Sequence, residues 1–280
     1  MKTITIKDHS VSKEVFELRY NPEFDMFETS PLPSPSELSK YYETEDYISH
    51  TDTKRNLFEK VYHVVRSYAI KNKIALINSL SEKGTFLDIG CGTGDVLKAA
   101  QNNGWTITGI EPNEKARAIA NLKTNNKVFD SSELNNLKAG SFDVISLWHV
   151  LEHLPNLEEH ISLFKRLLKP NGKLIIAVPN HKSYDAKYYK EYWAAYDVPR
   201  HLWHFSQTSI KLLFSKFGMT VTKILPMKFD AFYVSLLSEK YKTGYKNFIK
   251  AFFIGLRSNF KAKQTSEYSS LIYVIEKSNS

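Results

Sequence analysis

The sequence has only one cysteine among its 280 residues, Cys91, so no disulfide framework is available to it. It also has no apolar run close to the ~20 residues that a transmembrane helix requires. The opening stretch, Met1-Lys-Thr-Ile-Thr-Ile-Lys-Asp-His9, lacks the hydrophobic centre of a signal peptide. These absences predict a cytoplasmic protein without covalent cross-links.

Arginine-rich tracts and RNA-binding signatures are also absent, although the net charge is +8. The basic excess lies mainly toward the C-terminus, where the residues from Lys223 onward include ten Lys/Arg against four Asp/Glu. The hydrophobic and charged fractions, 42% and 24%, are those of an ordinary globular chain. We therefore interpret the positive charge as a solvated face and do not expect a nucleic-acid partner.

The most informative stretch is Phe86-Leu-Asp-Ile-Gly-Cys-Gly-Thr-Gly94, where an apolar strand pattern runs into a glycine-rich turn and then into a helical segment. Glycine permits positive φ angles and allows a ligand to lie against the backbone. A dinucleotide fingerprint would need glycine at Asp95. The spacing is instead D-x-G-x-G-x-G, which predicts a nucleotide site without a pyrophosphate. The alternative is a glycine turn that binds no ligand.

Strands and helices alternate regularly beyond this turn, which predicts an α/β fold. The expected strands are 106–110, 127–130, 141–147, 173–178, 220–225 and 270–276, with a sharp turn at 169–172. Glu111 ends the second strand, where one carboxylate can accept hydrogen bonds from two ribose hydroxyls. A solvated charge at the strand end is the alternative for Glu111.

Three further segments are predicted as additions to this alternation. Residues 1–50 read as a separate, weakly structured N-terminal extension, so that the main domain covers 51–280. Residues 55–80 form one long amphipathic helix or a bent pair, which buttresses the domain or closes over a ligand. Residues 229–263 form a helical insertion whose mixture of Phe, Leu and Lys suits a membrane surface or self-association.

Several motifs together resemble those of the UbiG-like class I methyltransferases, which use S-adenosylmethionine (AdoMet): Leu-Asp-Ile-Gly-Cys-Gly-Thr-Gly, Gly-Ile-Glu-Pro, Phe-Asp-Val-Ile-Ser-Leu-Trp-His-Val-Leu-Glu-His and Leu-Lys-Pro-Asn-Gly-Lys-Leu. The stretch Asp197-Val-Pro-Arg-His-Leu-Trp-His-Phe-Ser206 is similar to the branch called methyltransferase domain family 23. The resemblance implies a seven-stranded Rossmann-like sheet, with helices on both faces and the seventh strand inserted late.

The same resemblance implies AdoMet as the cofactor. The residues expected to bind it are Asp88, Gly90, Cys91, Gly92, Gly94, Glu111, Pro112, Phe129, Asp130 and Trp148. Phe129 would stack on the adenine and Asp130 would accept a hydrogen bond from its amino group, although Phe129 as an ordinary core residue is the alternative. Some relatives carry an N-terminal zinc module, but Tyr20-Asn-Pro-Glu-Phe24 stands here in place of C-P-x-C, so any such module would be degenerate and metal-free.

Because AdoMet carries an activated methyl group, the protein mainly positions the acceptor and sometimes removes a proton. The candidates for these roles follow the fourth strand or lie in residues 184–205, the excursion after the fifth strand. They are His149, His153, Arg200, His201 and His204. A neutral imidazole suits proton removal from a hydroxyl. The alternative is that these side chains only hold the loops together.

Two other functions fit parts of the sequence. His149-Val-Leu-Glu-His153 matches the inverted zinc-protease signature if both histidines share a helix face, but it lies within a coherent cofactor fold. A non-catalytic AdoMet-binding regulatory domain is the other alternative. We expect a methyltransferase without a metal, acting on a small-molecule, glycan or lipid-linked acceptor; whether oxygen, nitrogen or carbon is methylated stays open.

Overall fold

The structure, a computed structural model, describes residues 3–34, 37, 39–42 and 57–278. The chain divides into two compact units. Unit 1 comprises Met1–Thr44, His149–Glu158 and Ala177–Tyr273, and unit 2 comprises Glu45–Trp148, Glu159–Ile176 and Val274–Ser280. The N-terminal residues are thus grouped with two later segments, and the expected boundary near residue 50 lies outside the described residues.

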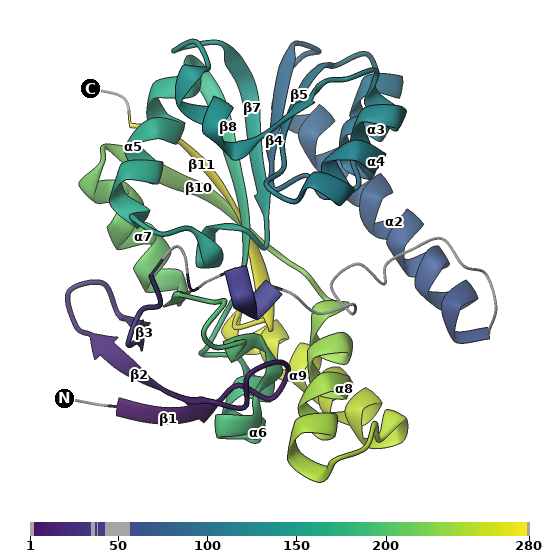
Figure 1. Cartoon of the computed structure of the whole chain (residues 1–280), viewed down its shortest axis with the longest axis vertical. Helices are drawn as coiled ribbons and strands as arrows, with labels where there is room; N and C mark the ends of the chain where they lie inside the picture. The colour runs from purple at the N-terminus through teal and green to yellow at the C-terminus, as the bar shows by residue number, and fades with distance from the viewer. Residues whose placement is uncertain (1–2, 35–36, 38, 43–56, 279–280) are drawn as a thin grey trace. The chain divides into compact units, whose positions relative to one another are not determined.

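The central feature is a seven-stranded sheet with the order β10-β11-β8-β7-β4-β5-β6 (Figure 1). Its strands are β4 (Thr85–Ile89), β5 (Thr106–Ile110), β6 (Val128–Phe129), β7 (Phe142–Trp148), β8 (Leu168–Pro179), β10 (Met219–Pro226) and β11 (Ser270–Lys277). β4 pairs in parallel with both β5 and β7, and β5 pairs in parallel with β6. The expected α/β fold is therefore confirmed.

The strand order explains where a ligand site can form. Successive strands proceed outward from β4 in one direction as far as β6, and the chain then returns to β7 on the other side of β4. Ligands of open parallel sheets bind beyond the carboxyl ends of the strands at such a reversal. The last strand, β11, lies between β8 and β10, which confirms the late insertion of the seventh strand.

The expected sharp turn at residues 169–172 is wrong, because β8 already begins at Leu168. Gly172 has a different purpose there. A Cβ at this position would lie 2.9 Å from the carbonyl oxygen of Phe142 on the neighbouring strand. Glycine therefore allows the two backbones to approach closely within the sheet.

The helices follow the predicted alternation. The α-helices are α2 (Leu57–Leu80), α3 (Asp95–Asn102), α4 (Glu114–Thr124), α5 (Leu157–Leu167), α6 (Tyr184–Tyr189), α7 (Gln207–Lys216), α8 (Asp230–Thr243) and α9 (Phe248–Thr265). Short 3₁₀ helices are η1 (Ser39–Tyr42), η3 (Ser131–Asn136), η4 (Leu151–His153), η5 (Lys190–Tyr192) and η6 (Ala194–Tyr196). The start of the helix expected at Arg55 falls outside the described residues.

The N-terminal segment is not weakly structured, contrary to the expectation from its sequence. It forms the strands β1 (Thr3–Lys7), β2 (Val15–Asn21) and β3 (Met26–Ser30) of an antiparallel sheet, which β9 (Trp203–His204) completes in the order β1-β2-β3-β9. In β2 the buried Phe16 and Leu18 alternate with the exposed Glu17 and Arg19. This period-2 pattern is the local signal for a strand.

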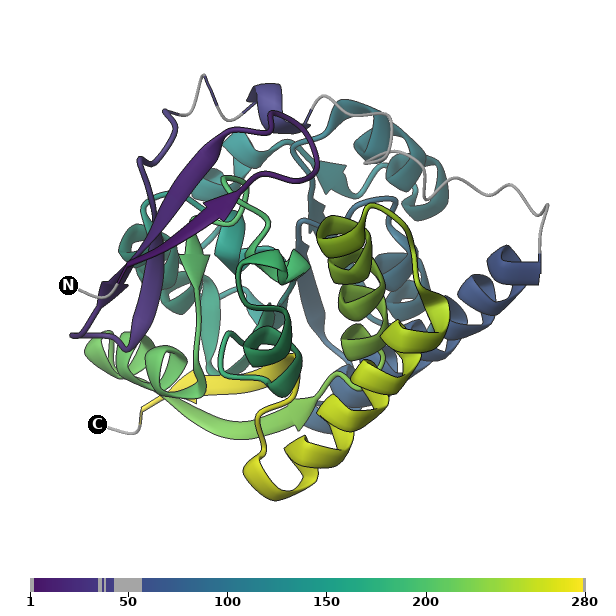
Figure 2. The ribbon, with the colours of Figure 1, turned by 90° about the horizontal axis from the view of Figure 1, so that it is seen from below.

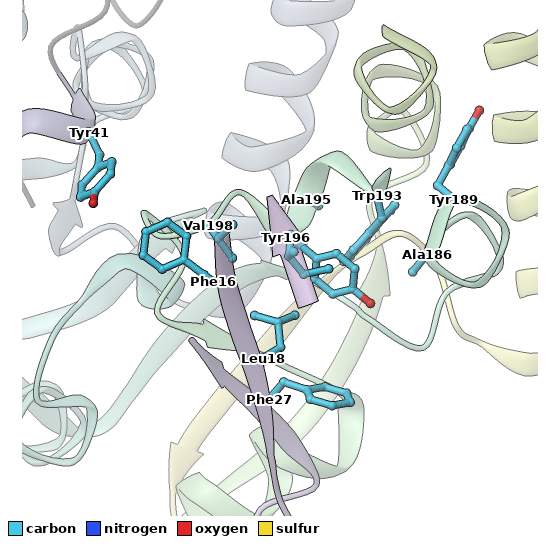
Figure 3. Close-up of a cluster of buried hydrophobic side chains, with 11 residues drawn as sticks. Phe16, Leu18, Phe27, Tyr41, Ala186, Tyr189, Trp193, Ala195, Tyr196 and Val198 are labelled. Carbon is cyan, nitrogen blue, oxygen red and sulfur yellow. The ribbon is translucent and has the colours of Figure 1, made fainter. Parts of the chain in front are cut away.

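The core of unit 1 lies where β2 meets the excursion after β8. Phe16, Leu18 and Phe27 from the N-terminal strands are in the same buried cluster as Trp193 and Tyr196 from the excursion (Figure 3). Trp193 and Tyr196 therefore serve as core residues of unit 1. The N-terminal strands and the excursion stabilise each other by burying these aromatic side chains.

The predicted insertion before the last strand is confirmed as the helix pair α8 and α9, which pack side by side (Figure 2). Gly255 permits the contact, because a Cβ there would lie 2.8 Å from a ring carbon of Phe232. Among the described residues, no helix combines the length and apolar character needed to cross a membrane.

Candidate functional site

The glycine turn lies directly after β4 in unit 2 and is anchored to the end of β5. The N–H groups of Gly90 and Cys91 donate to the carbonyl of Ile110 at 2.8 and 3.1 Å. Gly90, Gly92 and Gly94 have φ angles of 68°, 54° and 77°, which favour glycine. The turn therefore has the left-handed conformation that the motif predicts.

The glycines in this turn have different roles. A Cβ on Gly94 would lie 2.9 Å from Cβ of Ala120, so this glycine allows α3 and α4 to pack. A Cβ on Gly92 would meet no atom within 4 Å. Gly92 is thus the glycine whose surroundings leave room for a ligand against the backbone.

Glu111 is coupled directly to this turn. Its carboxylate accepts a 2.7 Å hydrogen bond from the N–H of Gly92 and a 2.9 Å bond from that of Asn113. Glu111 is only 7% exposed, so the alternative of a solvated charge at the strand end is wrong. Burial raises the pKa of Glu111, against the effect of these two bonds. A carboxylate has about four acceptor positions, so two stay available for ribose hydroxyls.

Asp88 lies inside β4 and is hydrogen-bonded to the neighbouring strand. It is 2% exposed and accepts a hydrogen bond from the hydroxyl of Ser146 on β7. Burial raises its pKa to about 7, against the lowering effects of Ser146 and of the Lys73 charge. Its described role is to join the two central strands below the turn.

Cys91 is partly buried in the turn, and its thiol is neutral. Burial raises its pKa, and the negative charges of Asp88 and Glu111 raise it further. A thiol in such surroundings is a poor nucleophile and a poor metal ligand. Cys91 therefore contributes backbone and volume to the turn.

Two residues expected beside the adenine lie at the edge of the sheet, where Phe129 ends β6 and Asp130 follows it. Phe129 is 42% exposed, so the alternative that it belongs to the core is wrong, and its ring is free to stack. Asp130 caps η3 by accepting from the N–H of Ser132 and pairs with Arg117 at 3.0 Å. The hydrogen bonds from Ser132 lower the pKa of Asp130. Pro112 is exposed between Glu111 and α4.

The helix α2 contributes two cations that the sequence did not reveal as site residues. Arg66 donates to Thr93 of the turn at 3.3 Å and pairs with Asp95 at the start of α3. The ammonium of Lys73 lies 4.3 Å from the ring centre of Trp148. Arg66 and Lys73 are seven residues apart, which places both on one helix face. This spacing was the signal in the sequence that could have identified them.

Trp148 ends β7, and its indole N–H is buried without a hydrogen-bond partner among the described atoms. An unpaired buried donor is costly. The open space at Gly92, the acceptor capacity of Glu111 and this donor are all features that a polar nucleoside cofactor would satisfy. The residues of unit 2 thus fit the cofactor that the resemblance implies.

The histidine candidates lie in unit 1 and do not share a helix face. His149 has a φ of 57° and precedes η4, whereas His153 ends that short helix. The helical i, i+4 arrangement required by the zinc-protease interpretation is therefore wrong.

His149 is held between two carboxylates. Its Nε2 lies 3.0 Å from Asp230 and its Nδ1 lies 3.4 Å from Glu152. Burial opposes protonation, but the hydrogen bond to Asp230 and the charges of Asp230 and Glu152 outweigh it and raise the pKa to about 10. The expectation of a neutral imidazole at His149 is thus wrong, and a protonated ring cannot accept a proton. Asp230 could not be identified from the sequence.

The remaining candidates make structural contacts. His204, on β9, lies with Nε2 3.0 Å from the hydroxyl of Thr29 on β3, and burial lowers its pKa well below the usual value. Arg200 donates to Asp197 at 2.9 Å and to the carbonyl of Tyr41 at 3.1 Å. Both side chains therefore join the excursion to the N-terminal segment.

His153 and His201 lie against each other, with ring centres 4.6 Å apart. Nδ1 of His153 is 3.0 Å from the carbonyl oxygen of Arg200, and Nδ1 of His201 is 2.9 Å from that of Ala195. Burial and the charge of His201 lower the pKa of His153 to about 4. His153 is thus a neutral imidazole, as proton removal or metal binding requires.

Comparisons with known proteins agree with this geometry. The model of a family described as methyltransferase domain matches residues 62–224. The ubiquinone biosynthesis O-methyltransferase of Dechloromonas aromatica is 35% identical over 107 residues, which are 35% of this chain and 46% of that protein. The corresponding enzyme of Pseudomonas paraeruginosa is 30% identical over 34% of this chain and 44% of its own length. The matches thus span less than half of these curated relatives.

Solved structures show the same fold at low identity. A SAM-dependent methyltransferase from Archaeoglobus fulgidus superimposes with a TM-score of 0.54 at 20% identity, covering 79% of this chain and 98% of that one. Magnesium protoporphyrin IX methyltransferase from Synechocystis, crystallised with SAH, superimposes with a TM-score of 0.57 at 16% identity, covering 88% of this chain and all of that one (100%).

Proposed function

The chain belongs to the methyltransferase domain family, and from this membership we propose that it transfers a methyl group from AdoMet to a small acceptor. The observation that carries the proposal is the hydrogen bond from Gly92 to Glu111. It brings the open stretch of backbone at Gly92 and a carboxylate with spare acceptor positions together at the carboxyl ends of β4 and β5. This is where open parallel sheets bind nucleosides.

Different side chains of unit 2 would bind different parts of the cofactor. We assign the ribose hydroxyls to Glu111, the adenine face to Phe129, and a polar group of the cofactor to the indole N–H of Trp148. Arg66 keeps the turn in place through Thr93 and Asp95. AdoMet supplies an activated methyl group when bound, so the chain needs to orient the acceptor and handle its proton.

The acceptor is inferred to be a small molecule. The curated relatives are named ubiquinone biosynthesis O-methyltransferases, which favours oxygen as the methylated atom and, of the expected acceptor classes, a lipid-linked compound over a glycan. A glycan acceptor stays within the proposal, because no described pocket is large enough to choose between them. The hollow beside His201, His204 and Trp203 has almost no space that a water-sized sphere can enter, whereas small-molecule sites enclose ~300 Å³ or more.

A lipid-linked acceptor would be met at a membrane surface, and α9 offers a face for this contact. Its exposed apolar side chains recur at helical spacing: Phe248, Ile249, Phe252, Phe253, Leu256 and Phe260. The helix pair also carries Lys240, Lys242, Lys250, Arg257, Lys261 and Lys263. A helix with an aromatic face and basic neighbours binds anionic lipid surfaces.

The test of the proposed function is a methyl-transfer screen with labelled AdoMet against metabolite, lipid and RNA fractions. Label in the metabolite or lipid fraction is expected. Label confined to RNA would contradict the small-molecule acceptor. AdoMet binding without transfer to any fraction would favour the alternative of a non-catalytic regulatory domain.

A further inference from the structure

Glu152, His153 and His201 form a cluster within unit 1 that the proposed cofactor site does not use. One potential ligand atom from each of the three side chains lies within 4.8 Å of the other two. Glu152 is 1% exposed and His201 is also buried. The cluster is held together by the backbone, because the N–H of Leu202 donates to the carbonyl of Glu152 at 2.8 Å.

The hydrogen bonds of the two histidines prepare them as ligands. In each ring Nδ1 faces a backbone carbonyl oxygen, of Arg200 for His153 and of Ala195 for His201, and the hydroxyl of Tyr42 also lies 3.0 Å from Nδ1 of His153. A carbonyl oxygen can only accept, so in the neutral form of each ring Nδ1 carries the proton and Nε2 keeps the lone pair that a cation would bind. Metal-binding histidines are oriented by this same kind of contact from the second ring nitrogen.

Glu152 supplies the observation that points to a cation. Neither carboxylate oxygen has a hydrogen-bond partner of normal geometry among the described residues, and the contact to His149 Nδ1 is long, at 3.4 Å. Buried carboxylates are otherwise paired or bound to a metal. The side chain of His149 is also drawn toward Asp230, at 3.0 Å.

We propose that Glu152, His153 and His201 bind one divalent transition-metal cation of the Zn²⁺ or Co²⁺ type. Two imidazole nitrogens and one carboxylate oxygen suit such a cation, whereas Mg²⁺ and Ca²⁺ prefer oxygen ligands. Ligands about 2.1 Å from a tetrahedral metal are ~3.4 Å apart, so binding draws the side chains together by about 1 Å. This proposal departs from the expectation of a metal-free protein, and it puts His201 in the place that the protease signature gave to His149.

Three protein ligands leave a fourth position open, as in catalytic zinc sites. A cation there would lower the pKa of an acceptor hydroxyl bound at this open position. This catalytic role rests on the proposed function. The binding claim does not, because it is tested without AdoMet or an acceptor.

The experiment uses the full chain without a polyhistidine tag, stripped with a chelator and titrated with Zn²⁺ by calorimetry and with Co²⁺ by visible absorption. We expect one equivalent to bind, with Co²⁺ bands typical of nitrogen and oxygen ligands. Glu152→Gln and His201→Gln should each weaken binding at least ~100-fold, since even second-shell changes cost 10–100-fold. The matched variants Glu158→Gln and His160→Gln lie outside the cluster and should bind as the wild type does.

X-ray absorption of the Zn²⁺-loaded wild type gives a readout that does not depend on how the variants fold. Two imidazoles in the zinc shell would support the site. Failure of the wild type to bind a stoichiometric cation, or equal binding by Glu152→Gln and His201→Gln, would overturn it. AdoMet binding measured on the same samples separates this outcome from failure of the proposed function.

Discussion

The backbone N–H of Gly92 donates a 2.7 Å hydrogen bond to the carboxylate of Glu111. Two residues that are nineteen positions apart thus act as one unit at the ends of β4 and β5. The bond uses part of the acceptor capacity of Glu111 and fixes the direction of the rest. Changes to either residue should therefore affect cofactor binding.

Gly92→Ala should weaken AdoMet binding by more than its cost in stability. Its φ of 54° is strained for alanine, by about 1–2 kcal/mol, and the added methyl group would occupy the open space beside the turn. Gly140→Ala is the matched control, because Gly140 has a φ of 61° and equally open surroundings away from the turn. Denaturant unfolding and calorimetry would measure both effects. Equal AdoMet affinities in the two variants would mean that no ligand lies against Gly92.

Arg200→Ala should destabilise the fold by about 3–5 kcal/mol, because it leaves the partly buried Asp197 without its partner. The change also removes the bond to the carbonyl of Tyr41. Urea unfolding would measure this, with the exposed Arg257→Ala as a control that should change stability little. A normally stable Arg200→Ala protein with lost turnover would instead place Arg200 in catalysis.

His149 should make the stability depend on pH. Its pKa is raised from 6.5 to about 10, so its contribution is complete below pH 6.5 and disappears as the pH rises through about 10. The difference in unfolding free energy between the wild type and His149→Gln should shrink over this window. Asp230→Asn removes the same contact and should show the same trend. A constant difference from pH 6 to 10 would mean that His149 is not held protonated.

Vesicle binding should depend on the exposed face of α9. Phe253 and Phe260 are 60% and 63% exposed, and replacing both with serine should weaken binding to anionic phosphatidylglycerol vesicles roughly tenfold or more. Leu122→Ser is the control, since Leu122 is even more exposed but lies on α4. Cosedimentation with anionic and neutral vesicles would measure this. Unchanged binding, or loss of a dimer in light scattering, would point to self-association instead.

The conformation of the glycine turn and the position of Glu111 could be predicted because their signals are local in sequence. The glycine spacing sets the backbone of the turn, and Glu111 follows directly from the end of its own strand. The exposure of Phe129 could not be decided in this way, because β6 is only two residues long and borders the sheet. The hydrogen bond between Gly92 and Glu111 could not be predicted either, because it depends on the pairing of β4 with β5.

The contacts of the candidate histidines could not be predicted, because they join segments that are distant in the sequence. Thr29 and His204 are 175 positions apart, and their contact depends on the pairing of β3 with β9. His149 was expected on a helix with His153, but its left-handed backbone conformation turns it toward Asp230. The alternation in β2 was visible in the sequence and was missed beside the nearby prolines.

The most direct measurement is the calorimetric titration of AdoMet and its demethylated product into the wild type and Glu111→Ala. The wild type should bind both nucleosides at one site. Glu111→Ala should weaken the binding of both nucleosides by about 1–3 kcal/mol, because the ribose hydroxyls and the N–H of Gly92 lose their acceptor. Absence of binding to the wild type, or tight binding of NAD instead, would contradict the assignment, and an unchanged affinity in Glu111→Ala would contradict the role of the carboxylate.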